Sequence, residues 1–276
     1  MAFNPVAGAR RARRGALALG VSAALVAGGL VTTPAHADER PLRLIPAAAC
    51  TTGSKALDIY SFNDFHGRIM EAGKLFTPVE EARAAGKNVL LTSNGDNIGG
   101  STFESASQED IPTLQILKAA GVAVSATGNH EYDLGMDKLA SRMNQEKPYA
   151  NVVTNVTDAK GNTPAPVKPY VIEEVAGVKV AVIGAVTGDL PSLVGQEGMK
   201  GLKVTDPVAA VNTYAKKIKA SGEASVIVAQ IHEGAADGSK TPADNAATSA
   251  AFKSIYENID PAVNMVFNGH THQKYN

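Results

Sequence analysis

The sequence contains no tryptophan and only one cysteine, Cys50, among its 276 residues. A metal site built from several thiolates is therefore excluded, because such a site needs more than one cysteine. In an exported chain, an odd cysteine indicates a free thiol or a lost disulfide partner; a lipid-anchored cysteine is a third option. A cleavage site upstream disfavours the lipid anchor, so the simplest interpretation is an unpaired thiol in a loose N-terminal arm.

Long hydrophobic runs are also scarce, and the chain has one, over residues 16–31. It is shorter than the ~20 apolar residues that a membrane-spanning helix needs. Four arginines between positions 10 and 14 precede it, and Ala35-His36-Ala37 follows it as a small-x-small cleavage site. This order predicts a secretory signal peptide over residues 1–37. We therefore expect a protein without a membrane span, secreted to the outside or the cell envelope by the general or the twin-arginine route.

A strong excess of charge is missing as well, because the formal net charge is −1. Residues 1–37 contain four arginines and no acidic residue, so the mature chain carries −5. Proteins that bind polymeric nucleic acid need a basic surface. We therefore expect no polymeric nucleic acid as partner. The hydrophobic content of 44% is ordinary for a globular protein and allows a sizeable core.

After a proline-containing linker over residues 38–54, strand-like and helix-like segments alternate along the chain. Such alternation is typical of the α/β class, with a mixed or parallel sheet. Predicted helices cover residues 74–85, 111–120, 135–145, 206–220 and about 246–256, and a mobile loop over residues 235–251 leads into the last one. Predicted strands cover residues 57–62, 89–92, 122–126, 152–153, 171–175, 178–186, 226–231 and 263–267.

The histidines follow the predicted strands. One of the six lies in the signal peptide, and each of the other five comes just after a strand, beside Gly, Asp or Asn. A single histidine in such a place would be an ordinary surface or core residue, but five of them indicate one shared site. In α/β folds, ligands bind outside the carboxyl ends of the strands, where such side chains meet. The five are His66, His130, His232, His270 and His272.

Imidazole, carboxylate and amide side chains without a thiolate form a ligand set typical of Zn, Mn, Fe, Co or Mg. About seven candidates are present, where one zinc ion needs three or four, so two divalent ions can be held if a carboxylate bridges them. Zinc-peptidase helices are excluded, because neither His130-Glu131 nor His232-Glu233 is followed by the second histidine of that motif. We interpret the two glutamates as structural or supporting residues. The sequence also lacks a nucleophile-elbow motif for serine hydrolysis.

The order of the motifs resembles the calcineurin-like metallophosphoesterase family. Within it, Asn63-Asp64-Phe65-His66-Gly67 and Asn129-His130-Glu131-Tyr132-Asp133 are most similar to secreted 5′-nucleotidases and 2′,3′-cyclic phosphodiesterases. The resemblance implies a four-layer α/β/β/α sandwich over residues 55–276. Its motifs are, in order, Asp64-Phe65-His66, Gly95-Asp96, Gly128-Asn129-His130-Glu131, His232 and Gly269-His270-Thr271-His272.

The same resemblance assigns nine residues to the site. It implies that His130 meets the phosphate, stabilises the developing charge and protonates the leaving oxygen, while Asp133 orients His130. Capping of the next helix is an equally good interpretation of Asp133. The implied metal ligands are Asp64, His66 and His272 for one ion, Asn129, His232 and His270 for the other, and Asp96 as the bridge between them.

The implied activity is that of a 5′-nucleotidase, which converts a nucleoside 5′-monophosphate to a nucleoside and phosphate in nucleotide catabolism. Hydrolysis of 2′,3′-cyclic nucleotides or of UDP-sugars is an alternative. In that group a C-terminal domain supplies arginines and an aromatic pair for the substrate. The sequence ends six residues after His270, so we expect that domain to be absent. A truncated metal-binding remnant without catalysis is the alternative from another class.

Overall fold

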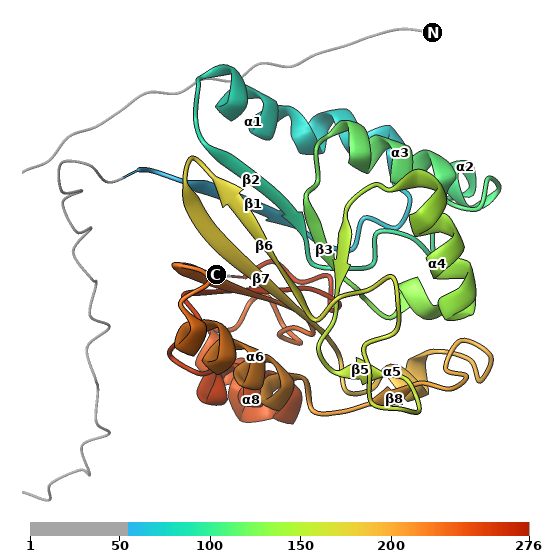
Figure 1. The fold of residues 1–276 in the computed structure, drawn as a ribbon. Helices are drawn as coiled ribbons and strands as arrows, with labels where there is room; N and C mark the ends of the chain where they lie inside the picture. The colour runs from blue at the N-terminus through green and yellow to red at the C-terminus, as the bar shows by residue number, and fades with distance from the viewer. Residues whose placement is uncertain (1–54, 276) are drawn as a thin grey trace, which may run out of the picture. The chain divides into compact units, whose positions relative to one another are not determined.

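The structure, a computed structural model, describes residues 55–275. The predicted signal peptide, the predicted linker and Cys50 lie outside the described residues. Within this range the chain forms two four-stranded sheets and one two-stranded sheet. The two larger sheets pack face to face between layers of helices (Figure 1).

The first sheet is parallel throughout and comes from the N-terminal half of the described range. Its strand order is β1-β2-β3-β4. Parallel strands need crossover connections, which cover the sheet and bury its short apolar strands. The connecting helices are α1 (Ala72–Ala84), α3 (Ile111–Ala119) and α4 (Gly135–Glu146) (Figure 1). The strands are β1 (Asp58–Phe62), β2 (Val89–Ser93), β3 (Val124–Ala126) and β4 (Ala150–Val152).

The second sheet is mixed and has the order β10-β9-β7-β6. The strands β6 (Tyr170–Val175) and β7 (Val178–Val186) form an antiparallel hairpin, whereas β9 (Val226–His232) and β10 (Met265–Asn268) join in parallel. The helix α6 (Pro207–Ser221) begins where predicted, because the Asp206 side chain accepts a hydrogen bond from Ala209 N.

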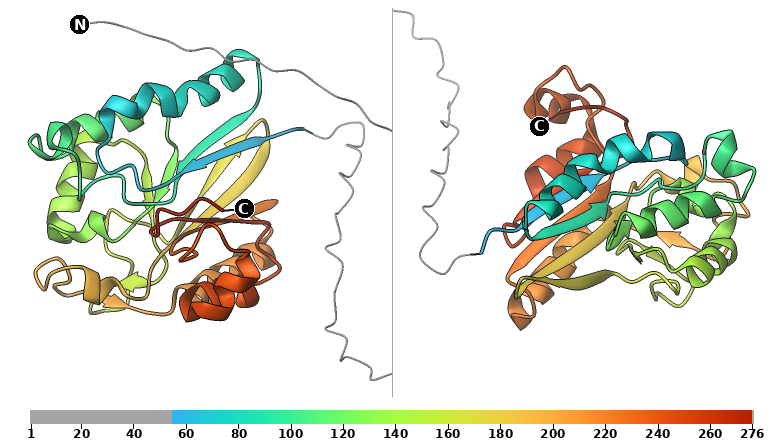
Figure 2. Two further views of the ribbon diagram at one scale, coloured as in Figure 1. Left: turned by 180° about the vertical axis from the view of Figure 1, so that it is seen from behind. Right: turned by 90° about the horizontal axis from the view of Figure 1, so that it is seen from above.

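Among the sets of buried apolar side chains, one lies between the two larger sheets and one lies under each helical layer. The set between the sheets contains Leu90 and Val124 from the first sheet, and Val182 and Val228 from the second. The helices α1 and α3 cover the outer face of the first sheet (Figure 2). The helices α6 and α8 cover that of the second. The predicted four-layer α/β/β/α sandwich is therefore confirmed.

The prediction for residues 235–256 is wrong in part. Instead of a mobile loop and one helix, the chain forms α7 (Pro242–Thr248) and α8 (Ala250–Asn258), separated by the extended residue Ser249. Ser249 caps α8 by accepting a hydrogen bond from Phe252 N, and Thr241 caps α7 in the same way. A capping residue followed by proline starts both α6 and α7. The start of α7 was not predicted, because it lies in an alanine-rich stretch that was interpreted as a loop.

Several short elements were not predicted, because they are too short to show a periodic pattern. They are η1 (Ile69–Glu71), α2 (Phe103–Ala106), η2 (His130–Tyr132), α5 (Leu190–Leu193) and the pair β5 (Val156–Thr157) and β8 (Lys203–Val204).

No helix within residues 55–275 is long and apolar enough to cross a membrane.

Two leucines test the packing between the sheets. Leu90 is 3% exposed between the sheets, whereas Leu193 in α5 is 46% exposed. Leu90→Ala should lower the free energy of unfolding by about 2–5 kcal/mol, because it leaves a cavity. Leu193→Ala should change it by about 0.5 kcal/mol or less. Urea denaturation followed by circular dichroism measures both, and equal effects would contradict this packing.

Candidate metal centre

The nine residues named from the sequence lie together where β1, β2, β3, β9 and β10 end. Backbone hydrogen bonds join the loops that carry them. His66 N donates to Asp96 O at 3.0 Å, which ties the loop after β1 to the loop after β2. His270 N donates to the Asp64 carboxylate at 3.0 Å, which ties the second sheet to the first. The fold thus brings motifs from both sheets to one edge.

Asp96 lies at the centre of the cluster. Its Oδ2 is 3.1 Å from His232 Nε2 and 3.7 Å from His66 Nε2. Asp64 Oδ1 is 3.3 Å from His272 Nε2. Asp96 is thus shared between neighbouring groups of possible ligand side chains. Three groups have ligand atoms that all lie within 4.8 Å of one another: Asp64, His66 and His272; His66, Asp96 and His130; and Asp96, His232 and His270.

Backbone carbonyls orient two of the imidazoles. His66 Nδ1 lies 2.8 Å from Gly99 O, and His232 Nδ1 lies 2.8 Å from Asn94 O. A carbonyl can only accept, so in each ring Nδ1 carries the proton and donates it. The Nε2 atoms therefore face the carboxylates, and each ring would present a free electron pair there once Nε2 carries no proton. This is the arrangement by which protein scaffolds prepare histidine to bind a metal ion.

Two buried polar atoms of the cluster make no hydrogen bond within the described structure. They are Asn129 Oδ1 and His232 Nε2. Buried polar atoms are almost always paired, so each unpaired one needs a physical account. Both are electron-pair donors at the cluster, and an amide oxygen and an imidazole nitrogen are ordinary ligands for divalent ions of the Zn and Mn type. The residues present therefore fit a bound metal.

Burial and neighbouring charges shift the pKa values of Asp96 and His270. Burial alone would raise the pKa of the Asp96 carboxyl, but the interaction with His232 outweighs it and brings the pKa to about 2. Asp96 is therefore ionised at neutral pH. Burial lowers the pKa of His270, and the neighbouring His232 lowers it further, so this imidazole is kept neutral.

Glu131 lies buried beneath the cluster, with 3% of its surface exposed. Its Oε2 accepts hydrogen bonds from Asp96 N at 2.9 Å and Gly128 N at 2.6 Å, and its Oε1 accepts one from Asn97 N at 2.9 Å. Burial, followed by the negative charge of Asp96, raises the pKa of Glu131 to about 7. Through these hydrogen bonds Glu131 holds the backbone of the loops after β2 and β3 in place. This agrees with its interpretation as a structural residue.

Five of the nine residues adopt the left-handed backbone region that side chains usually avoid. Such conformations cost of order 1–3 kcal/mol each and gather at functional sites, where the surrounding structure imposes them. Gly128 is also constrained, because a Cβ added there would overlap Asp96 Oδ1. The φ angles are 53° for Asp64, 45° for His66, 53° for Asp96, 74° for His270 and 53° for His272.

His130 is held from two sides. Its backbone N–H donates to Asp96 Oδ1 at 2.9 Å, and its Nδ1 lies 2.7 Å from Asp133 Oδ2. The hydrogen bond that the Asp133 carboxylate accepts from His130 raises the pKa of His130, while partial burial opposes that rise. Asp133 makes no capping hydrogen bond to α4, whose N-cap residue is Leu134. Of the two interpretations of Asp133, the structure favours its contact with His130.

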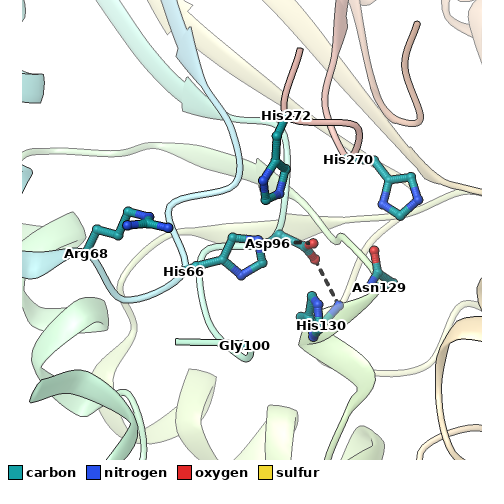
Figure 3. A pocket seen from close by; sticks show the side chains of 8 residues that line it. All are labelled: His66, Arg68, Asp96, Gly100, Asn129, His130, His270 and His272. Atoms are coloured by element: carbon teal, nitrogen blue, oxygen red, sulfur yellow. Dashed lines mark hydrogen bonds and ion pairs between the residues drawn. The ribbon is translucent and has the colours of Figure 1, made fainter. Parts of the chain in front are cut away.

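The cluster lines an open cavity of about 270 Å³ (Figure 3). Two of the lining residues, Arg68 and Gly100, were not named from the sequence. The signal for Arg68 was its place directly after the Asn63–Gly67 motif, and the signal for Gly100 was the Gly99-Gly100 pair after β2. The lining residues are His66, Arg68, Asp96, Gly100, Asn129, His130, His270 and His272.

A four-layer sandwich that carries this cluster at the ends of its strands defines a metal-dependent hydrolase of the phosphoesterase class. The chain belongs to the calcineurin-like phosphoesterase family, whose model matches residues 57–274. The resemblance seen in the motifs is thus confirmed, and with it a phosphoester hydrolase with candidate sites for two metal ions.

Several known proteins are similar to this chain. Endonuclease YhcR of Bacillus subtilis (strain 168) is 29% identical over 250 residues, which span 80% of this chain and 20% of that protein. The 5′-nucleotidase of Vibrio cholerae is 30% identical over 194 residues, which span 64% of this chain and 34% of that protein. A putative 5′-nucleotidase from Staphylococcus aureus shares the fold, with a TM-score of 0.62 at 19% identity over 78% of this chain and 45% of that one. The chain thus spans about a third or less of these curated relatives.

Glu131→Gln tests the support beneath Asp96. The amide would turn two donor hydrogens toward backbone N–H groups that now face a carboxylate oxygen. We expect the free energy of unfolding to fall by about 1–3 kcal/mol. The affinity for Mn²⁺ should fall about 10- to 100-fold, as for other residues that orient metal ligands. Calorimetric titration with Mn²⁺ measures the affinity, with Glu174→Gln on the exposed part of β6 as control. Wild-type affinity in Glu131→Gln would contradict this role.

Proposed function

We propose that this protein hydrolyses nucleoside 5′-monophosphates to a nucleoside and phosphate. The observation that carries the proposal is the convergence of ligand side chains from both sheets on Asp96, with His130 beside them in the same cavity. The similarity to the 5′-nucleotidase of Vibrio cholerae supports a nucleotide as substrate. The charge of −5 outside residues 1–37 supports a small substrate rather than a polymeric nucleic acid.

We assign the metal ligands by the groups that the fold brings together. The identity of the two ions, among Zn, Mn, Mg, Fe and Co, is left to measurement. When bound, two divalent ions supply neutralisation of phosphate charge and a lowered pKa of water. The proposed ligands are Asp64, His66 and His272 for one ion, Asn129, His232 and His270 for the other, and Asp96 for both.

His130 is the proposed acid. It follows the ligand Asn129 directly, and its ring lies in the cavity at a centroid distance of 5.1 Å from His66. Asp133 holds Nδ1, so Nε2 is the atom available to a phosphate ester. From there His130 donates a hydrogen bond to the phosphate and passes its proton to the leaving nucleoside oxygen, which stabilises the charge that develops as the P–O bond breaks.

The domain and export assignments complete the proposal. Residues 55–276 form the catalytic domain, and residues 1–37 direct export and are removed. The mature chain then begins at Asp38. N-terminal sequencing of the exported protein tests this assignment, and an intact Met1 on it would contradict it.

His130→Ala separates catalysis from metal binding. The variant should lose about 10²- to 10⁴-fold in kcat on AMP, because it removes the acid. Its metal content should remain at the wild-type value, because the ligands are untouched. Elemental analysis and phosphate release measure the two quantities. A variant that loses metal together with activity would place His130 among the ligands, and unchanged kcat would remove it from the mechanism.

A substrate panel tests the specificity. We expect kcat/KM of the Mn²⁺-loaded protein to be highest for AMP, lower for 2′,3′-cyclic AMP and UDP-glucose, and lowest for single-stranded DNA. A higher value for the cyclic nucleotide or the UDP-sugar would select that activity instead. Two bound metal ions without turnover of any substrate, a generic aryl phosphate included, would indicate a metal-binding protein without catalysis.

A further inference from the structure

Arg68 stands out among the residues around the cavity. Of the eight lining residues it is the one Lys or Arg, and its side chain is exposed. Figure 3 places it at one end of the cavity, beside His66 and away from Asn129 and His270. A guanidinium group at this place bears a permanent positive charge that the metal ligands do not provide.

The backbone holds Arg68 at this position. The preceding residues His66 and Gly67 both have left-handed φ angles, of 45° and 63°, which turn the chain sharply after the metal-binding motif. Arg68 N donates to Phe65 O at 3.0 Å, and Phe65 is buried against Phe62 and Phe76. Arg68 therefore projects from an anchored turn.

Arg68 also differs from the other arginines of residues 55–275. Arg83 pairs with Glu80 at 2.6 Å, and Arg142 lies 4.0 Å from Asp110. Within the same range, no carboxylate lies at ion-pair distance from Arg68. Its guanidinium is thus available to an anion at the mouth of the cavity. Arginine binds phosphate through two parallel hydrogen bonds, which makes phosphate oxygens the matching ligand.

We propose that Arg68 is a substrate-binding residue that contacts the terminal oxygens of the phosphate and makes the site prefer monoesters over diesters. This inference rests on the proposed function. A phosphate monoester carries a charge of about −1.5 to −2 at neutral pH, with three terminal oxygens. A diester carries one negative charge and has two terminal oxygens. A guanidinium beside the metal centre therefore stabilises a bound monoester more than a bound diester.

The experiment compares Arg68→Ala and Arg68→Lys with wild type on p-nitrophenyl phosphate and bis(p-nitrophenyl) phosphate. Arg68→Ala should lower kcat/KM for the monoester about 10- to 100-fold, mainly through KM, because charged hydrogen bonds to the substrate are lost. The diester should be affected much less, and Arg68→Lys should recover part of the loss. The control is Lys219→Ala, on the exposed side of α6, which removes one positive charge elsewhere.

An equal loss on both esters, or no loss on either, would overturn the proposal while leaving the proposed function intact. Binding of inorganic phosphate to the Mn²⁺-loaded protein, measured by calorimetry, gives a readout without turnover. Arg68→Ala should weaken it about 10- to 100-fold. If wild type hydrolyses neither these esters nor AMP, the proposed function fails. The binding measurement still decides the role of Arg68, because equal phosphate affinity in wild type and Arg68→Ala overturns it.

Discussion

Two carboxylates, Asp64 and Asp96, lie 3.8 Å and 3.1 Å from the Nε2 atom of the same buried imidazole, His232. Their side chains are only 5% and 2% exposed. Buried charges of one sign cost free energy unless positive charge or hydrogen-bond donors compensate them. Backbone donors, His270 N and His130 N, supply part of that compensation. A bound metal ion would supply the rest, and the imidazole nitrogens and the amide oxygen around these carboxylates suit such an ion.

The four-layer sandwich makes this arrangement possible. Parallel strands from the two sheets end at one edge of the fold, so the loops that follow these strands lie next to one another. The cost appears in the backbone, where Asp64 and Asp96 take left-handed conformations. Glu131 offsets part of that cost by binding the N–H groups of Asp96 and Gly128. The rigid layers thus hold a local geometry that an isolated loop would not keep.

The sequence predicted the sheets and the site more fully than the connections. The cluster could be predicted because His, Asp and Asn follow the predicted strands. The α/β pattern places the carboxyl ends of those strands at one edge of the fold. The sequence did not predict α7, whose Thr241-Pro242 start lies in an alanine-rich stretch. The contact between Asp133 and His130 was expected from the family resemblance alone, because it depends on the path of η2. Arg68 was also missed, since nothing in its own motif shows that its side chain borders the cavity.

Anomalous X-ray diffraction from crystals grown with Mn²⁺ tests the central claim most directly. Two anomalous peaks should appear about 3.5–4 Å apart, as in two-metal sites generally. Both should lie within bonding distance of the Asp96 carboxylate, one toward His66 and the other toward His232. A single peak, or two peaks of which neither touches Asp96, would contradict the account.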